Sequence, residues 1–217
     1  MTRNGAKLYG ARMAISSDRV ELFLAEKGIE VEFVPVNLMA GEHYSEDYRR
    51  RIAPNARVPA LELDDGTVLR ESVAICRYFE ASQPEPALFG GTPLEQARVE
   101  MWQRLMELEL LMPIAMAFRH GHPAAKALEQ PQIAEHAAVQ KQRAEKRIGV
   151  LDKELAGRDY LAGDFSIADI TAFLAIRFGR LSKIAPEPGH AAVQAWMERV
   201  AARPAIATAL QRIKDAS

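Results

Sequence analysis

Residues 57–72 read RVPALELDDGTVLRES, and this stretch predicts two short strands, a tight turn and the start of a helix. The turn signal Asp64-Asp65-Gly66-Thr67 lies between two apolar runs, as in a β-hairpin with an Asp-Gly turn. Pro59 cannot donate to a sheet ladder, so it belongs at an edge, a first position or a bulge. Glu71-Ser72 then opens a helix that continues through an apolar run.

The chain before this stretch predicts a β-α-β unit. Lys7-Leu8-Tyr9-Gly10 is a short strand pattern, and a loop leads from it to Ser16-Ser17-Asp18, which offers several helix N-cap groups. Apolar residues at helical spacing follow until Gly28, the expected terminator. Residues 29–33 then alternate with the period of two of a half-buried strand, and Pro35 ends the run.

The segment 83–91 has the composition of a linker and divides the chain. Three prolines and two glycines occur between Gln83 and Pro93, and such clusters mark turns and loops. We therefore expect an α/β domain over residues 1–82 and an all-helical domain over residues 92–217.

The second part of the chain carries helix signals without a competing strand pattern. Thr92 and Glu95 predict a capping box, with a proline at the first helical position. Ser166 and Asp169 predict a second capping box. The last expected helix contains residues 193–200 and stops near a proline at position 204.

Composition excludes several classes of function. The 217 residues include 28 Lys+Arg and 29 Asp+Glu, giving a net charge of −1, so the basic surplus that a nucleic-acid binder usually needs is missing. The sequence shows no secretion signal and no apolar run near the roughly 18 residues of a membrane span. Cys76 is the single cysteine, which excludes an internal disulfide framework and a cysteine-cluster metal site. We expect a cytoplasmic protein with no metal and no nucleic-acid or membrane partner.

Five segments, taken in their order and spacing, resemble the cytosolic glutathione transferase family. They are Lys7-Leu8-Tyr9; Arg19-Val20 with Leu24-Ala25-Glu26-Lys27-Gly28-Ile29; Ala53-Pro54-Asn55-Ala56-Arg57-Val58-Pro59-Ala60-Leu61; Glu71-Ser72-Val73-Ala74-Ile75; and Leu161-Ala162-Gly163-Asp164-Phe165-Ser166-Ile167-Ala168-Asp169. The resemblance covers nearly the whole chain, although residues 110–155 match only as generic helix. It implies a thioredoxin-like N-terminal domain, an all-α C-terminal domain and a homodimer. It further implies a detoxification enzyme that adds the glutathione thiolate to electrophilic, mostly apolar small molecules.

The resemblance also implies where glutathione binds. It makes Val58-Pro59 a cis peptide whose valine backbone binds the cysteinyl part of glutathione, and an X-Pro bond is held cis at a cost of only about 0.5–1 kcal/mol. Glu71 would accept the γ-glutamyl ammonium, while Ser72 and the N–H groups of its helix would bind the carboxylate. Arg57 is the expected cation for the glycyl carboxylate. His43 stands where many relatives carry a polar glutathione contact, although it can equally be a solvated surface residue.

The catalytic group is expected at Ser16. Ala14 stands where many serine-type relatives hold their catalytic hydroxyl, and it has none, whereas other bacterial relatives place an asparagine at the position of Ser16. A hydroxyl donor and the helix N-terminus would both favour the thiolate. Ser17, Tyr9 and a backbone group remain alternatives, because a serine at position 16 would also serve as a helix cap.

The second substrate is expected in a cleft between the domains, lined by Met13, Met112, Met116 and Phe118. Methionines adapt to varied apolar shapes, although such a row at helical spacing can also belong to the core. Two other functions remain open. One is glutathione-dependent reduction of disulfides or peroxides, which would run through glutathione itself because Cys76 forms no C-x-x-C pair. The other is a non-catalytic binding or regulatory protein, since Ala14 lacks the hydroxyl.

Overall fold

The structure, a computed structural model, describes residues 2–215 and their side chains from residue 5 onward. Contacts divide the chain into two compact units, Met1–Ala87 with Arg203–Ser217, and Leu88–Ala202. The bounds predicted from the sequence were residues 1–82 for the first domain and residues 92–217 for the helical domain. The two divisions differ for residues 203–217, which the contacts group with the first unit. Leu88 belongs to the second unit because its side chain is buried and its carbonyl accepts a hydrogen bond from the Ile167 N–H at 3.0 Å.

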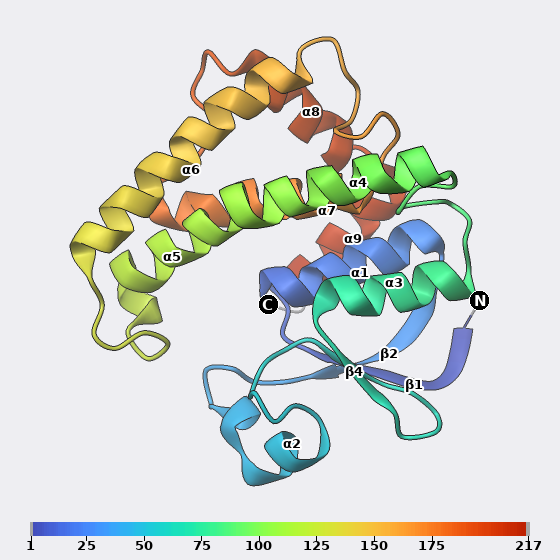
Figure 1. The fold of residues 1–217 in the computed structure, drawn as a ribbon. Helices are drawn as coiled ribbons and strands as arrows, with labels where there is room; N and C mark the ends of the chain where they lie inside the picture. The colour runs from blue at the N-terminus through green and yellow to red at the C-terminus, as the bar shows by residue number, and fades with distance from the viewer. Residues whose placement is uncertain (1, 216–217) are drawn as a thin grey trace. The chain divides into compact units, whose positions relative to one another are not determined.

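The first unit is a four-stranded mixed sheet with helices on both sides (Figure 1). Its elements are β1 (Thr2–Gly10), α1 (Ile15–Lys27), β2 (Glu30–Pro35), η1 (Glu42–Tyr44), α2 (Glu46–Arg51), β3 (Ala60–Glu62), β4 (Val68–Arg70), α3 (Ser72–Ser82) and α9 (Pro204–Asp215). The strand order is β2-β1-β3-β4, with β1 parallel to β2 and antiparallel to β3, and β3 antiparallel to β4. The predicted β-α-β unit, hairpin and thioredoxin-like domain are confirmed.

Helix α1 begins earlier than its capping signals suggested. Ala14 is the N-cap, so Ser16-Ser17-Asp18 lie within the first turn. The Asp18 carboxylate nevertheless serves the helix start, because its Oδ1 accepts a hydrogen bond from the Met13 N–H at 3.0 Å. Gly28 ends the helix as predicted, with a left-handed φ of 62° that glycine adopts without a steric penalty.

The prediction that the helix containing residues 193–200 is the last one was wrong, because helix α9 follows it. Pro204 does stop the preceding helix, but it also begins a new one, since a proline at the first helical position gives up no helical hydrogen bond. Helix α9 packs beside α1 (Figure 1). Arg203 fixes this end of the chain, because its guanidinium donates to the two carboxylate oxygens of Glu26 at 2.8 and 2.7 Å.

The second unit is entirely helical in the part that the structure describes, as predicted. Its elements are α4 (Pro93–Leu105), the π-helical turn η2 (Met106–Leu111), α5 (Met112–Gly121), η3 (Pro123–Ala125), α6 (Ala134–Leu155), α7 (Ile167–Gly179), η4 (Arg180–Ser182) and α8 (Ala191–Ala201). The π-helical turn has a local cause, because Pro113 lacks the N–H that would bond to the Glu109 carbonyl, and its ring would clash with that carbonyl. Within residues 2–215, no helix is long and apolar enough to cross a membrane.

Both predicted capping boxes are present. At α4, the Glu95 carboxylate accepts from the Thr92 N–H at 3.0 Å, and the Thr92 hydroxyl oxygen accepts from the Glu95 N–H at 3.3 Å. At α7, the fully buried Asp169 carboxylate accepts from the Ser166 N–H and hydroxyl, each at 3.1 Å. It also accepts from the Leu161 N–H at 3.1 Å and from the Trp196 indole N–H at 2.9 Å. Asp169 therefore joins three segments of the second unit.

Candidate functional site

A cavity of about 70 Å³ in the first unit brings together most of the predicted site residues. Its lining consists of Ser16, Asn55, Arg57, Val58, Pro59, Arg70, Glu71 and Ser72. Asn55 and Arg70 also line it, although neither was predicted from the sequence as a site residue. Asn55 stands in the motif that precedes Val58-Pro59, and Arg70 immediately precedes Glu71, so their positions beside assigned residues were the available signal.

The loop before β3 is fixed at the cavity by a small apolar cluster beneath it. Val58 packs against this cluster, which includes the buried residues Tyr48 and Ile52. The Tyr48 hydroxyl donates a hydrogen bond to the Arg57 carbonyl at 2.9 Å. Burial raises the pKa of Tyr48 to about 12, so this hydroxyl keeps the proton that it donates. The Val58–Pro59 peptide is cis.

Glu71 and Ser72 form the start of α3 at the edge of the cavity. Glu71 is the N-cap and has φ 69° and ψ 117°, a conformation that costs a non-glycine residue about 1–3 kcal/mol and that clusters at ligand sites. Ser72 is the first residue of the helix, and its hydroxyl oxygen accepts a hydrogen bond from Nη1 of Arg19 at 2.8 Å. Since a hydroxyl has one proton and two lone pairs, Ser72 can still donate to a ligand.

Of the three side chains considered for the catalytic role, Ser16 is the one that lines the cavity. It is the second residue of α1, where backbone N–H groups have no partner inside the helix. Ser17 is fully buried, and its hydroxyl oxygen accepts from the Ala11 N–H at 3.2 Å. The Tyr9 hydroxyl donates to the Glu62 carboxylate at 2.7 Å, and burial together with this hydrogen bond raises the pKa of Tyr9 to about 12.

His43 does not line the cavity. It lies in η1, where its ring is buried beside the ring of Tyr44 with 3.9 Å between the ring centroids. Burial lowers the pKa of His43, which disfavours its cationic form. The polar ligand contact proposed for this residue therefore stays a prediction.

The charges around the cavity suit a ligand that carries both signs. Arg57 and Arg70 provide two guanidinium groups and Glu71 one carboxylate, while Ser16 and Ser72 add hydroxyls at the N-terminal ends of α1 and α3. Such groups can bind carboxylates through the cations and helix ends, and an ammonium through the carboxylate. Cys76 is fully buried in α3, and burial raises the pKa of its thiol, so the reacting sulfur would have to come from the ligand.

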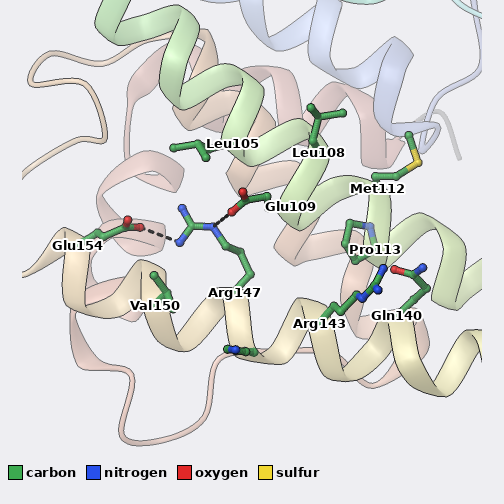
Figure 2. A pocket seen from close by; sticks show the side chains of 11 residues that line it. Leu105, Leu108, Glu109, Met112, Pro113, Gln140, Arg143, Arg147, Val150 and Glu154 are labelled. Atoms are coloured by element: carbon green, nitrogen blue, oxygen red, sulfur yellow. Dashed lines mark hydrogen bonds and ion pairs between the residues drawn. The ribbon is translucent and has the colours of Figure 1, made fainter.

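A second cavity, of about 510 Å³, lies in the helical unit between the segment from α4 to α5 and helix α6 (Figure 2). Met112 lines this cavity, whereas Met116 and Phe118 are not part of its lining. Phe118 packs instead against the rings of His122 and Phe178, each 4.8 Å away between centroids. Met13, the fourth residue assigned to the apolar substrate site, belongs to the other unit and is exposed.

Two family models match the chain. The glutathione S-transferase N-terminal domain matches residues 5–81, and the glutathione S-transferase C-terminal domain matches residues 106–204. Among curated proteins, Glutathione S-transferase 2 of Saccharomyces cerevisiae is 37% identical over 199 residues, covering 89% of this chain and 84% of that protein. Glutathione S-transferase 3 of Zea mays is 36% identical over 219 residues, covering 92% of this chain and 90% of that protein.

Solved structures show the same similarity. A glutathione S-transferase domain-containing protein of Marinobacter aquaeolei superposes with a TM-score of 0.87 at 37% identity, covering 92% of this chain and 99% of that one. Gtt2 of Saccharomyces cerevisiae superposes with a TM-score of 0.86 at 34% identity, covering 94% of this chain and 99% of that one.

Proposed function

This chain belongs to the glutathione S-transferase family and is an enzyme of that family, and we propose that it adds the thiolate of glutathione to electrophilic, mostly apolar small molecules at the cavity beside α3. The observation that carries the proposal is the convergence of Ser16, Arg57, Val58, Glu71 and Ser72 on this one cavity. Glutathione is the co-substrate of the family.

The cavity's charges support a specific orientation for glutathione, which carries two carboxylates, one ammonium and one thiol. Glu71 binds the γ-glutamyl ammonium, and Ser72 with the first N–H groups of α3 binds the neighbouring carboxylate. The Val58 backbone binds the cysteinyl part, and Arg57 binds the glycyl carboxylate. This orientation directs the thiol toward Ser16 at the start of α1.

Ionisation of the thiol explains only a small part of the proposed acceleration. A free thiol with a pKa near 8.5 is about 3% thiolate at pH 7, and lowering the pKa to roughly 6.5 raises this fraction about 25-fold. Nucleophilicity falls as the pKa falls, with a Brønsted slope of about 0.4–0.5, so roughly eightfold of that gain is lost. Holding thiolate and electrophile together in one site must therefore supply most of the rate.

Replacing Ser16 with alanine should raise the pKa of the bound glutathione thiol by about 1 to 2. A hydrogen bond to a charged group is worth about 1.5–3 kcal/mol, and one pKa unit corresponds to about 1.36 kcal/mol. The measurement is the thiolate absorbance of the glutathione complex against pH. Ser17→Ala is the matched control. Ser17 is buried and its hydroxyl oxygen accepts the Ala11 N–H, so this substitution should leave the pKa of the glutathione thiol unchanged. An unchanged pKa in Ser16→Ala would assign activation of the thiol to another group.

The choice of electrophile needs a substrate panel. Halo-aromatics and epoxides report conjugation, whereas hydroperoxides and mixed disulfides report reduction through glutathione. We retain Met13, Met112, Met116 and Phe118 as the proposed contacts for the apolar substrate, and we place the reaction in the cytoplasm because the chain has a single cysteine. A protein that fails to bind glutathione would contradict both enzymatic readings, while binding without any reaction would favour a non-catalytic protein.

We also propose that two copies associate through the outer face of the helical unit. Leu94, Met101 and Leu108 recur every seven residues, yet they are 60%, 50% and 48% exposed; we call these three residues the outer stripe. Leu108 also borders the cavity of Figure 2, which carries both acidic and basic side chains. Because a two-fold interface places the same patch on both copies, a patch with an apolar centre and both signs of charge can complement itself.

The double variant Met101→Lys with Leu108→Lys should convert the dimer to a monomer. Facing copies would then bring four added positive charges into one apolar contact, and burying unpaired charges is strongly unfavourable. Sedimentation equilibrium measures the association state. Leu128→Lys is the control, since Leu128 is similarly exposed but lies outside the outer stripe. A wild-type monomer, or a dimer that the double substitution leaves intact, would contradict the proposed interface.

A further inference from the structure

Arg19 is a buried guanidinium that joins the two helices whose first residues line the glutathione cavity. It is only 2% exposed, and its Nη1 donates to the Ser72 hydroxyl oxygen at 2.8 Å. Arg19 lies one helical turn after Ser16 in α1, while Ser72 opens α3. This hydrogen bond therefore connects a buried residue of α1 to a residue that lines the cavity at the start of α3.

The charge of Arg19 acts inside the unit rather than at its surface. Burial raises the pKa of the Cys76 thiol one turn after Ser72, and the positive charge of Arg19 opposes that increase. Because the surroundings of Arg19 are shielded from water, its positive charge is weakly screened and can act through Ser72 on a carboxylate bound at the start of α3.

We infer that Arg19 is a positioning residue for the γ-glutamyl carboxylate of glutathione, an inference that rests on the proposed function. With one lone pair of Ser72 filled by the Arg19 N–H, the remaining Ser72 proton is directed away from Arg19 and is available to the carboxylate in the cavity. The guanidinium polarises that hydroxyl, because hydrogen bonds in a chain strengthen one another at low dielectric. Arg19 thus binds the carboxylate through Ser72 without touching it.

The test compares glutathione with an analogue that lacks the γ-glutamyl α-carboxylate. Arg19→Gln should weaken glutathione binding about fivefold to tenfold, measured by titration calorimetry, and should leave binding of the analogue unchanged. In kinetics the loss should appear in KM for glutathione rather than in kcat. In a Ser72→Ala background, Arg19→Gln should cause no further loss of glutathione affinity, because the hydroxyl that connects Arg19 to the carboxylate is already absent.

Arg19→Lys is the second variant, since it keeps a buried cationic donor and should recover part of the affinity. Equal losses for glutathione and the analogue would overturn the inference and leave Arg19 a purely structural residue. Additive losses in the Ser72→Ala background would overturn it too, as would failure of both Arg19 variants to fold. A wild-type protein that does not bind glutathione would instead refute the proposed function.

Discussion

Replacing Asp169 with alanine should lower the free energy of unfolding by about 3–5 kcal/mol, because it strips one acceptor from several buried donors. The N–H groups of Leu161 and Ser166 and the indole of Trp196 all donate to this fully buried carboxylate. Burial raises the pKa of Asp169 to about 6, so most molecules carry the ionised form at pH 7.5. Urea denaturation at that pH, followed by circular dichroism, measures the loss as a shift of the midpoint.

Asp164→Ala is the matched control for this prediction. Asp164 stands five residues earlier in the same segment, but its side chain is exposed, so its removal should change the free energy of unfolding by no more than about 0.5 kcal/mol. A loss below about 1 kcal/mol in Asp169→Ala would show that water or a rearranged loop satisfies the four buried donors, the Ser166 hydroxyl among them.

Glu71→Gln should weaken glutathione binding by about 10- to 100-fold. The substitution keeps the shape of the side chain and removes the negative charge that we expect opposite the γ-glutamyl ammonium. A hydrogen bond between charged partners contributes about 1.5–3 kcal/mol, and each 1.4 kcal/mol changes the dissociation constant tenfold. Titration calorimetry with glutathione provides the measurement.

Two controls separate this effect from a general change in charge. Glu46→Gln removes a carboxylate that is exposed in α2 and does not line the cavity, so the affinity should stay within about twofold. A glutathione analogue without the γ-glutamyl ammonium should bind wild type and Glu71→Gln alike. If Glu71→Gln binds glutathione as wild type does, the ammonium lies elsewhere.

Local signals explain which parts of the fold could be predicted. The hairpin around Gly66 and the capping box at Thr92 depend on neighbouring residues, and both were found. Pro204 was ambiguous, because proline disrupts a helix interior but is favoured at the first position, and deciding between these requires the packing of α9 on α1. The same capping signals predicted the helix containing Met101 but could not reveal that the outer stripe is exposed while Trp102 and Met106 are buried.

The candidate site likewise contains residues that local motifs predict and contacts that they do not. Val58, Glu71 and Ser72 line the cavity, and they could be proposed from the sequence because each belongs to a short continuous motif, residues 53–61 for Val58 and residues 71–75 for the other two. The contact between Arg19 and Ser72 joins residues 53 positions apart, and a single arginine in an amphipathic helix gives no sign that it is buried. The burial of His43 could not be predicted either, since its neighbours in the sequence are polar although η1 buries its ring.

The return of α9 to α1 sets an order of events during biosynthesis. Arg203 is 177 residues beyond Glu26, and at about 5–20 residues per second the ribosome needs roughly 10 to 35 s to make the intervening chain. During that interval the surface of α1 that α9 covers remains open to solvent and to chaperones. The helical unit, Leu88–Ala202, is continuous in the chain and can fold before α9 packs on α1 in the sheet unit. The sheet unit is therefore completed only after its C-terminal helix has been made, although every residue that lines the cavity beside α3 is made early.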